Sequence, residues 1–169
     1  MTLALTPAYV ALGANLDDPV ATVIAALEAL KNLSHSRLVA TSSLYRTAPV
    51  GLKDQPDFIN AVAALETELT PAALLEELFA IEARFGRRRS VRNAPRTLDL
   101  DLLLHGNTRS DHPAITLPHP RMHERAFVLA PLAEIAPDLA IPGQGEVKQL
   151  LSACASQAIS RLPAATGNP

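Results

Sequence analysis

The chain has 169 residues, of which 48% are hydrophobic and 19% charged, and its formal net charge at pH 7 is −2. This size and composition fit one globular domain with a single core, and they exclude a disordered chain or a solenoid. The single cysteine excludes an internal disulfide, and no apolar run reaches the roughly 18 residues that a membrane-spanning helix needs. We therefore expect a cytoplasmic protein with no membrane association.

The first third of the chain predicts strands and one helix. Residues 9–15 form a short apolar run that ends near a glycine, which predicts a buried strand. Asp18 followed by Pro19 is typical of a helix start. Residues 36–50 predict a second strand that runs into a proline-containing loop. Residues 57–69 alternate with apolar side chains on both faces, which predicts a strand covered on both sides.

The middle of the chain predicts a helix, a basic loop and a strand. Thr70 followed by Pro71 starts a helix that Gly86 ends. Residues 87–96 are then a loop, and residues 97–104 are a strand. The resulting order of strand, helix, strand, strand, helix, strand is that of ferredoxin-like folds. We therefore expect an α+β fold in which helices pack on a mainly antiparallel sheet.

The last third predicts two helices. The first covers residues 125–136 and is kinked or ends near Pro131. The second is amphipathic and covers residues 146–159. A tail rich in proline, alanine and glycine follows, so we expect one domain over residues 1–160 and a loose tail over residues 161–169.

Two aspartates interrupt the leucine-rich strand. Because residues i and i+2 of a strand point to the same face, Asp99 and Asp101 stand side by side, whereas the leucines at even positions from 98 to 104 point to the other face. Two like charges at this spacing raise one pKa unless a cation lies between them. That cation could be an arginine, in structural salt bridges, or a divalent metal ion.

Arginines are concentrated just before this strand. Six of the 15 basic residues lie within residues 84–96, with no acidic residue among them, and such a local field attracts anions. Mg²⁺ prefers one or two carboxylates together with substrate phosphates. The arrangement therefore favours a metal–polyphosphate site, and the absence of a G-x-x-x-x-G-K-[ST] motif excludes a P-loop.

Several longer segments extend this interpretation. In order they are "YVALGANLDDP", "SSLYRTAPVGLKDQPDFINAVAALET", "IEARFGRRR", "PRTLDLDLLLHG" and "LPHPRMHERAFVLAPLAEIAP". They cover about residues 9–140 and resemble the successive signatures of the 6-hydroxymethyl-7,8-dihydropterin pyrophosphokinase family of folate biosynthesis. The resemblance implies transfer of a pyrophosphoryl group from ATP to the hydroxymethyl oxygen of the dihydropterin, with release of AMP. It also implies two Mg²⁺ ions, an α-β-α sandwich around a ferredoxin-like core, and a monomer.

The same resemblance implies roles for individual residues. Asp99 and Asp101 would bind both metal ions, and Arg87 and Arg96 would be catalytic by neutralising the phosphates in the transition state. The positions matched to ATP binding are Glu82, Arg89, Arg92, Arg96, His119 and Arg125. The positions matched to pterin binding are Thr47, Ala48, Val50, Phe58, Asn60 and Phe127.

Simpler roles remain open for some of these positions. The arginines at 88, 89 and 92 could face solvent, in a loop about one residue shorter than we expect for the family. Glu82 could form only an ion pair, and Phe58 and Phe127 could be ordinary core residues. The chain also lacks the tryptophan that many members have in this loop.

Two other functions compete with this hypothesis. Ferredoxin-like sheets often bind RNA, but aromatic residues make up only 4% of the chain, and none of them is tryptophan. A nucleotide-binding module without catalysis is the second alternative. We expect ATP and the pterin to be the partners, and no nucleic acid.

Overall fold

The computed structural model describes residues 4–49, 54–86 and 98–163. Up to residue 105 its elements are β1 (Thr6–Ala14), α1 (Pro19–Lys31), β2 (Ser36–Thr41), β3 (Tyr45–Thr47), β4 (Phe58–Thr67), α2 (Pro71–Arg84) and β5 (Asp99–His105). The later elements are β6 (Ser110–His112), β7 (Ile115–Leu117), the 3₁₀ turn η1 (Met122–Glu124), α3 (Ala126–Ile135), β8 (Ala140–Ile141), β9 (Gly145–Glu146), α4 (Val147–Ala153) and β10 (Ser160–Arg161).

One six-stranded sheet organises the fold. Its order is β10-β3-β4-β1-β5, with β2 also paired to β4, and every neighbouring pair is antiparallel. The order β5, β1, β4 and then β2 or β3 is the ferredoxin-like arrangement, which confirms the predicted fold class. The single strand expected over residues 36–50 is two strands. They share the ten-residue β4, since β2 pairs with its C-terminal part and β3 with its first residues.

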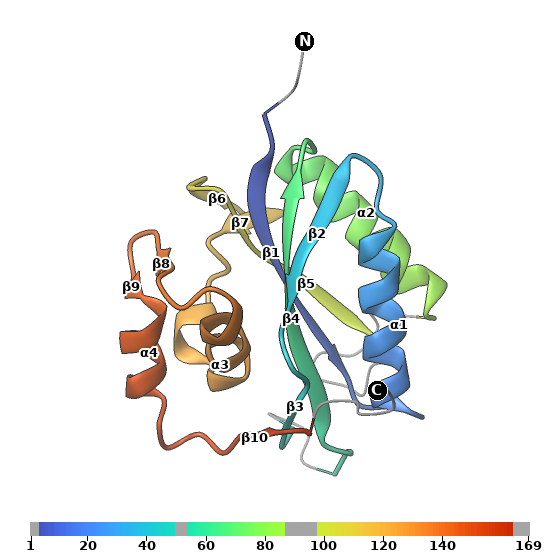
Figure 1. Cartoon of the computed structure of the whole chain (residues 1–169), viewed down its shortest axis with the longest axis vertical. Helices are drawn as coiled ribbons and strands as arrows, with labels where there is room; N and C mark the ends of the chain where they lie inside the picture. Colours follow the sequence, from blue (N-terminus) through green and yellow to red (C-terminus); the bar gives the residue numbers. More distant parts are fainter. Residues whose placement is uncertain (1–3, 50–53, 87–97, 164–169) are drawn as a thin grey trace.

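The helices form a layer on each side of the sheet, as an α-β-α sandwich requires. Figure 1 shows α1 and α2 on one side and α3 and α4 on the other. The predicted helix starts are confirmed, because Asp18 Oδ1 accepts from the N–H of Ala21 and Thr70 Oγ1 accepts from the N–H of Ala73, both at 3.2 Å. Gly86 follows α2 with a φ of +80°, which suits glycine. No helix in the described part of the chain is long and apolar enough to cross a membrane.

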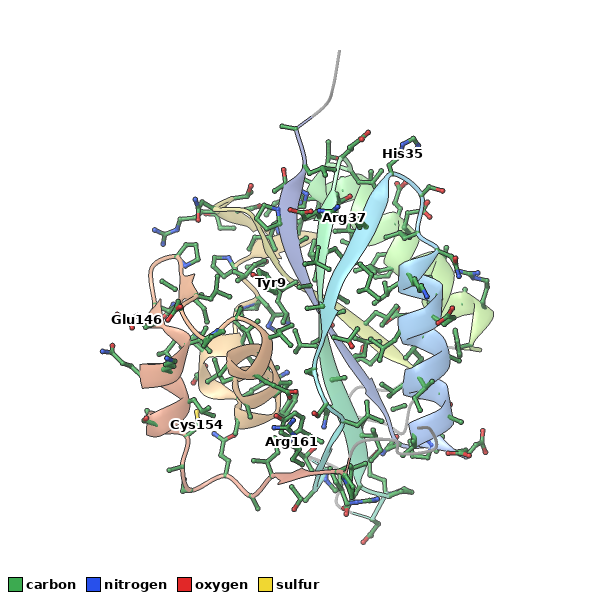
Figure 2. All side chains as sticks on the ribbon, in the orientation of Figure 1. Tyr9, His35, Arg37, Glu146, Cys154 and Arg161 are labelled. Atoms are coloured by element: carbon green, nitrogen blue, oxygen red, sulfur yellow. The ribbon has the colours of Figure 1, made fainter. Side chains whose placement is uncertain are left out.

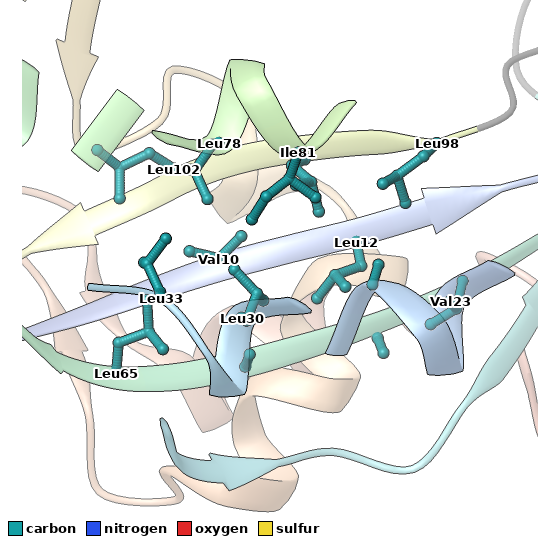
Figure 3. Packing of buried hydrophobic residues seen from close by; sticks show 14 of the residues in the cluster. Val10, Leu12, Val23, Leu30, Leu33, Leu65, Leu78, Ile81, Leu98 and Leu102 are labelled. Atoms are coloured by element: carbon teal, nitrogen blue, oxygen red, sulfur yellow. The ribbon is translucent and has the colours of Figure 1, made fainter. Parts of the chain in front are cut away.

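Two apolar clusters fill the spaces between these layers. In the first, side chains of β1, β4 and β5 pack against α1 and α2; Figure 3 shows Leu78 and Ile81 of α2 in it. The second lies between the sheet and the layer of α3 and α4. Strand β4 contributes to both, since Ile59 belongs to the first cluster and Val62 to the second. This confirms that β4 is covered on both faces.

A β-bulge in β5 breaks the expected alternation. Tyr9 lies opposite Leu104, but the next residue of β1, Val10, lies opposite Leu102. Leu103 is therefore the additional residue of β5. As a result Leu104 packs in the second cluster together with Leu103, and the prediction that it shares a face with Leu102 is wrong.

The C-terminal third differs from its prediction in two ways. Helix α3 covers Ala126–Ile135, within the predicted residues 125–136, and includes Pro131. Helix α4, however, ends at Ala153, well short of residue 159. The tail expected to be loose from Arg161 is anchored at its start, because Arg161 pairs with Tyr45 between β10 and β3. Residues 164–169 lie outside the described residues.

Candidate active site

A cavity lies where the strands of the sheet meet the start of α3. Strand β1 provides one wall, β3 and β4 a second, β5 a third, and the segment from η1 to α3 the fourth. Its lining residues are Ala11, Leu12, Gly13, Thr47, Ala48, Phe58, Asn60, Asp99, Asp101, Arg121, Arg125 and Phe127. This first cavity thus brings together both aspartates and the described pterin positions, although these residues are far apart in sequence.

The acidic wall is formed by Asp99 and Asp101. On β5 they lie opposite Gly13 and Ala11 of β1, and their side chains share one face of the strand, as predicted. Arg125 stands in the same cavity. Burial lowers the pKa of the Arg125 guanidinium, and the negative charge of nearby Asp101 opposes that shift. Negative and positive groups therefore face one space, as polyphosphate binding through a metal ion requires.

The other end of the first cavity is apolar with one amide. The Nδ2 of buried Asn60 donates to Thr47 Oγ1 at 2.7 Å. Its Oδ1 faces Gly13, where the Cβ of any larger residue would lie only 3.1 Å from that oxygen. Phe58 and Phe127 line the same space. Apolar rings with an amide at the edge are what a flat heteroaromatic molecule needs for binding.

A second cavity lies on the α2 side of Asp101. Its walls are formed by α2, β5 and the segment from residue 113 to residue 120, and they include Leu75, Phe79, Leu102 and His119. Asp101 lines both the first and the second cavity. The two cavities are therefore adjacent, with Asp101 at their junction.

His119 is uncharged in this setting. Burial, and after it the positive charge of Arg125, lower the pKa of His119 to about 4, although Asp99 acts in the opposite direction. Its Nδ1 accepts from the backbone N–H of Arg121 at 3.2 Å, and its own backbone N–H donates to the Leu103 carbonyl at 2.9 Å. Because Nδ1 is an acceptor in the neutral ring, Nε2 has the proton and is a donor.

Glu82 lies beside the strand that bears the aspartates. Its side chain is buried on α2, and its Oε2 accepts from the backbone N–H of Leu100 at 2.7 Å. Leu100 is the residue between Asp99 and Asp101. The linings of the first and second cavities do not include Glu82, so its role in ATP binding stays a prediction.

Some predicted residues fall outside the described part, and some lining residues were not predicted. Those outside the described residues are Val50, Arg87, Arg89, Arg92 and Arg96. Four residues line the first cavity without having been predicted: Arg121, just before η1, and Ala11, Leu12 and Gly13 of β1. The signal for Arg121 was its place between His119 and Arg125 in "PHPRMHER", and that for Gly13 was the glycine near the end of a buried strand.

Comparison with known proteins identifies the class of this protein as a transferase for phosphate-containing groups. The family model for 7,8-dihydro-6-hydroxymethylpterin-pyrophosphokinase (HPPK) matches residues 9–137. Proteins named 2-amino-4-hydroxy-6-hydroxymethyldihydropteridine pyrophosphokinase from Pseudomonas aeruginosa and Haemophilus influenzae are 52% and 48% identical to the chain. These alignments cover 93% and 92% of the chain and 97% of each relative. The chain belongs to the HPPK family of ATP-dependent enzymes, which transfer a pyrophosphoryl group to hydroxymethyldihydropterin in folate biosynthesis.

Solved structures support the fold. A crystal structure of Plasmodium falciparum HPPK-DHPS, wild type with STZ-DHP, matches with a TM-score of 0.72 at 12% sequence identity. The match covers 90% of this chain and 44% of that one. At this identity the likeness concerns the fold alone.

Proposed function

We propose that the first cavity binds the dihydropterin, that the second binds the nucleoside part of ATP, and that Asp99 and Asp101 act between them. In the reaction the hydroxymethyl oxygen of the pterin attacks the β-phosphorus of ATP. A new O–P bond forms, the bond from that phosphorus to the bridging oxygen of the α-phosphate breaks, and AMP leaves. The hydroxyl proton is lost to solvent.

The junction of the two cavities at Asp101 is the observation on which this assignment rests. Direct transfer between two substrates requires that their reacting ends meet within bonding distance. A pterin in the first cavity and a nucleoside in the second would both direct their reacting ends toward Asp101. The transfer therefore needs no covalent intermediate between enzyme and substrate, since positioning and charge neutralisation supply most of the catalysis.

For the pterin we propose binding by the residues around Asn60. Phe58 and Phe127 would contact the two faces of the ring, and the Asn60 amide would pair with donors and acceptors at its edge. The Oδ1 of Asn60 faces the space beside Gly13, whereas its Nδ2 already contacts Thr47. Ala48 lines the same cavity, and we also keep Val50, from the sequence, in this set.

For ATP we propose binding by His119, which lines the second cavity, and by Arg125, which lines the first cavity together with both aspartates. The neutral His119 ring would donate through Nε2, and the Arg125 guanidinium would neutralise a phosphate. The remaining residues proposed for the nucleotide and its phosphates are Glu82, Arg87, Arg89, Arg92 and Arg96. Of these, Arg87 and Arg96 would neutralise charge in the transition state.

We propose that Asp99 and Asp101 hold two Mg²⁺ ions. Both side chains are hard oxygen donors on one face of β5, beside a basic wall, and this donor set suits Mg²⁺ shared with substrate phosphates. When bound, the ions would neutralise phosphate charge and orient the reacting oxygen. Leu100 and Glu82 fix the backbone between the two aspartates.

Two broader properties belong to the same proposal. We propose that the enzyme works as a monomer, because residues of one chain line both substrate cavities. Light scattering at the working concentration tests this state. We also propose a cytoplasmic location, because its co-substrate ATP is made and used inside the cell.

The test is a product assay with ATP, Mg²⁺ and 6-hydroxymethyl-7,8-dihydropterin, in which the nucleotides are separated by chromatography. AMP should appear only when the pterin is present, and chelation of Mg²⁺ with EDTA should stop its formation until Mg²⁺ is added back. Formation of ADP, or turnover that persists in EDTA, would contradict the proposal. ATP binding without turnover would favour a nucleotide-binding module without catalysis.

A further inference from the structure

The side chain of Gln157 contacts the backbone on both sides of Arg125. Its Oε1 accepts from the N–H of Ala126 at 2.9 Å, and its Nε2 donates to the carbonyl of Glu124 at 2.8 Å. Gln157 lies 31 residues beyond Ala126 in the sequence. It also lies outside residues 9–137, which the family model matches.

These two bonds constrain the conformation of Arg125. With φ −118° and ψ 113°, Arg125 is extended, so the preceding carbonyl and the following N–H point to the same side of the chain. One primary amide contacts both groups, as a neighbouring strand would. Gln157 also satisfies the first N–H of α3, because Arg125 is the N-cap residue and its own side chain makes no capping bond.

The orientation of Arg125 matters for the site. Its side chain lines the first cavity, and its Cζ lies 5.4 Å from the centroid of the Phe127 ring. The negative charge of Asp101 acts on its guanidinium. A rotation of the backbone at residue 125 would move this charge relative to the aspartates and to a bound phosphate.

The segment that bears Gln157 is itself held at both ends. Before it, the buried Cys154 packs in the second apolar cluster, and Figure 2 shows its position beside α4. After it, Ser160–Arg161 forms β10 and pairs with β3, while the N–H of Leu162 donates to the Leu44 carbonyl at 2.8 Å. Figure 1 shows this segment passing from α4 to the edge of the sheet at β3.

From these contacts we infer that Gln157 is a positioning residue for Arg125, so that the C-terminal segment sets the geometry of the nucleotide site. Gln157 does not touch the substrates in this role. It acts through the backbone of residues 124–126. The inference rests on the proposed role of Arg125 in binding ATP.

The first test is the variant Gln157→Ala, compared with Gln149→Ala, which changes an exposed glutamine of α4. We expect kcat/KM for ATP to fall about tenfold in Gln157→Ala, because a misplaced charge contributes less to the transition state. KM for the pterin should change less than kcat/KM for ATP, since Phe58 and Asn60 lie on β4, away from residues 124–126. Gln149→Ala should behave as wild type in both measurements.

A double-mutant cycle with Arg125→Ala separates this role from a general effect on the fold. If Gln157 acts through Arg125, removing Gln157 should change kcat/KM for ATP by less than about twofold once Arg125 is absent. Equal losses in both backgrounds, or wild-type kinetics of Gln157→Ala beside an impaired Arg125→Ala, would overturn the inference. Wild-type kinetics of Arg125→Ala would instead contradict the proposed role of Arg125. All measurements are made below the melting temperature of the least stable variant.

Discussion

Asp99 and Asp101 line the first cavity from β5, and Asp101 also lines the second, so both carboxylates face the space proposed for a metal ion and the substrate phosphates. We predict that Asp99→Asn or Asp101→Asn lowers kcat by about a thousandfold or more, because an amide lacks the charge that balances the metal ion. The change preserves shape, so the melting temperature should move little. The same product assay and a thermal melt measure the two effects.

Asp138→Asn is the matched control for this pair, since Asp138 is exposed and lines neither the first nor the second cavity. It should retain wild-type turnover. If Asp99→Asn or Asp101→Asn also turned over at the wild-type rate, the aspartates would be structural rather than catalytic.

His119 gives a prediction for stability against pH. Its pKa in the fold is about 4, below its ordinary value of 6.5, so the unfolded chain takes up a proton that the folded chain does not. The free energy of unfolding should therefore fall as the pH drops from 6.5 toward 4. We expect His119 to account for about 1–2 kcal/mol of this fall, because solvent reaches part of the ring.

Urea unfolding at several pH values measures this effect. The amide of His119→Asn cannot take up the proton. Between pH 6.5 and pH 4 the free energy of unfolding of this variant should therefore fall by about 1–2 kcal/mol less than that of wild type. The exposed His112→Asn is the control and should follow the wild-type curve. Identical curves for wild type and His119→Asn would show that the fold does not hold this ring in its neutral form.

At the scale of elements, Glu134 joins α3 to the edge of the sheet. Its carboxylate accepts from the N–H and Oγ of Ser43, from the Tyr45 hydroxyl at 2.8 Å, and from Arg161 of β10 at 3.3 Å. Figure 2 shows Arg161 at this edge. Burial, and after it the bond to Glu134, raise the pKa of Tyr45 to about 12. β3 leads directly to Thr47, so this network supports one wall of the first cavity.

We predict that Glu134→Gln lowers the free energy of unfolding by about 1–2 kcal/mol at pH 7, because the amide accepts fewer and weaker hydrogen bonds. Burial alone would raise the pKa of Glu134, but the bonds from Tyr45 and Ser43 outweigh it and lower the pKa below 4.5. The Glu134 carboxylate therefore contributes its full stabilisation of the fold at pH values above its ordinary pKa of 4.5. Its contribution is lost as the pH falls through the lowered pKa.

Denaturant unfolding of Glu134→Gln and wild type at neutral and acidic pH measures this contribution. The difference between them should shrink in acid, and the exposed Glu146→Gln should show no comparable loss. A difference that is independent of pH would mean that the carboxylate charge does not contribute.

At the scale of the whole molecule, the sheet depends on its packing against α1 and α2. Leu78 of α2 is fully buried in the first apolar cluster (Figure 3). We predict that Leu78→Ala lowers the free energy of unfolding by about 2–5 kcal/mol, since it leaves a cavity in the core. Ile24→Ala on α1, whose side chain is 49% exposed, should cost far less.

Thermal and denaturant unfolding measure both variants, and turnover well below the melting temperature provides a second readout. We expect Leu78→Ala to keep most of its kcat while folded, because the substituted side chain lies outside the linings of both cavities. Equal losses of stability in the two variants would contradict the assignment of Leu78 to the core.

The sequence by itself determined the features that depend on neighbours along the chain. Asp18 and Thr70 marked helix starts because a side-chain oxygen reaches an N–H three residues on. Residue alternation showed that β4 is covered on both faces. Spacing of two residues placed Asp99 and Asp101 on one face, and the quoted motifs identified the family and most residues of the first cavity.

Only the tertiary structure decided the features that depend on residues far apart in sequence. β2 and β3 are separate because they pair with different parts of β4. The bulge at Leu103 arises from the pairing of β5 with β1, and it moves Leu104 into the other cluster. The contacts of Gln157 with the backbone around Arg125 form only when the C-terminal segment crosses the start of α3. Such pairings join distant parts of the chain, and local periodicity gives no information about them.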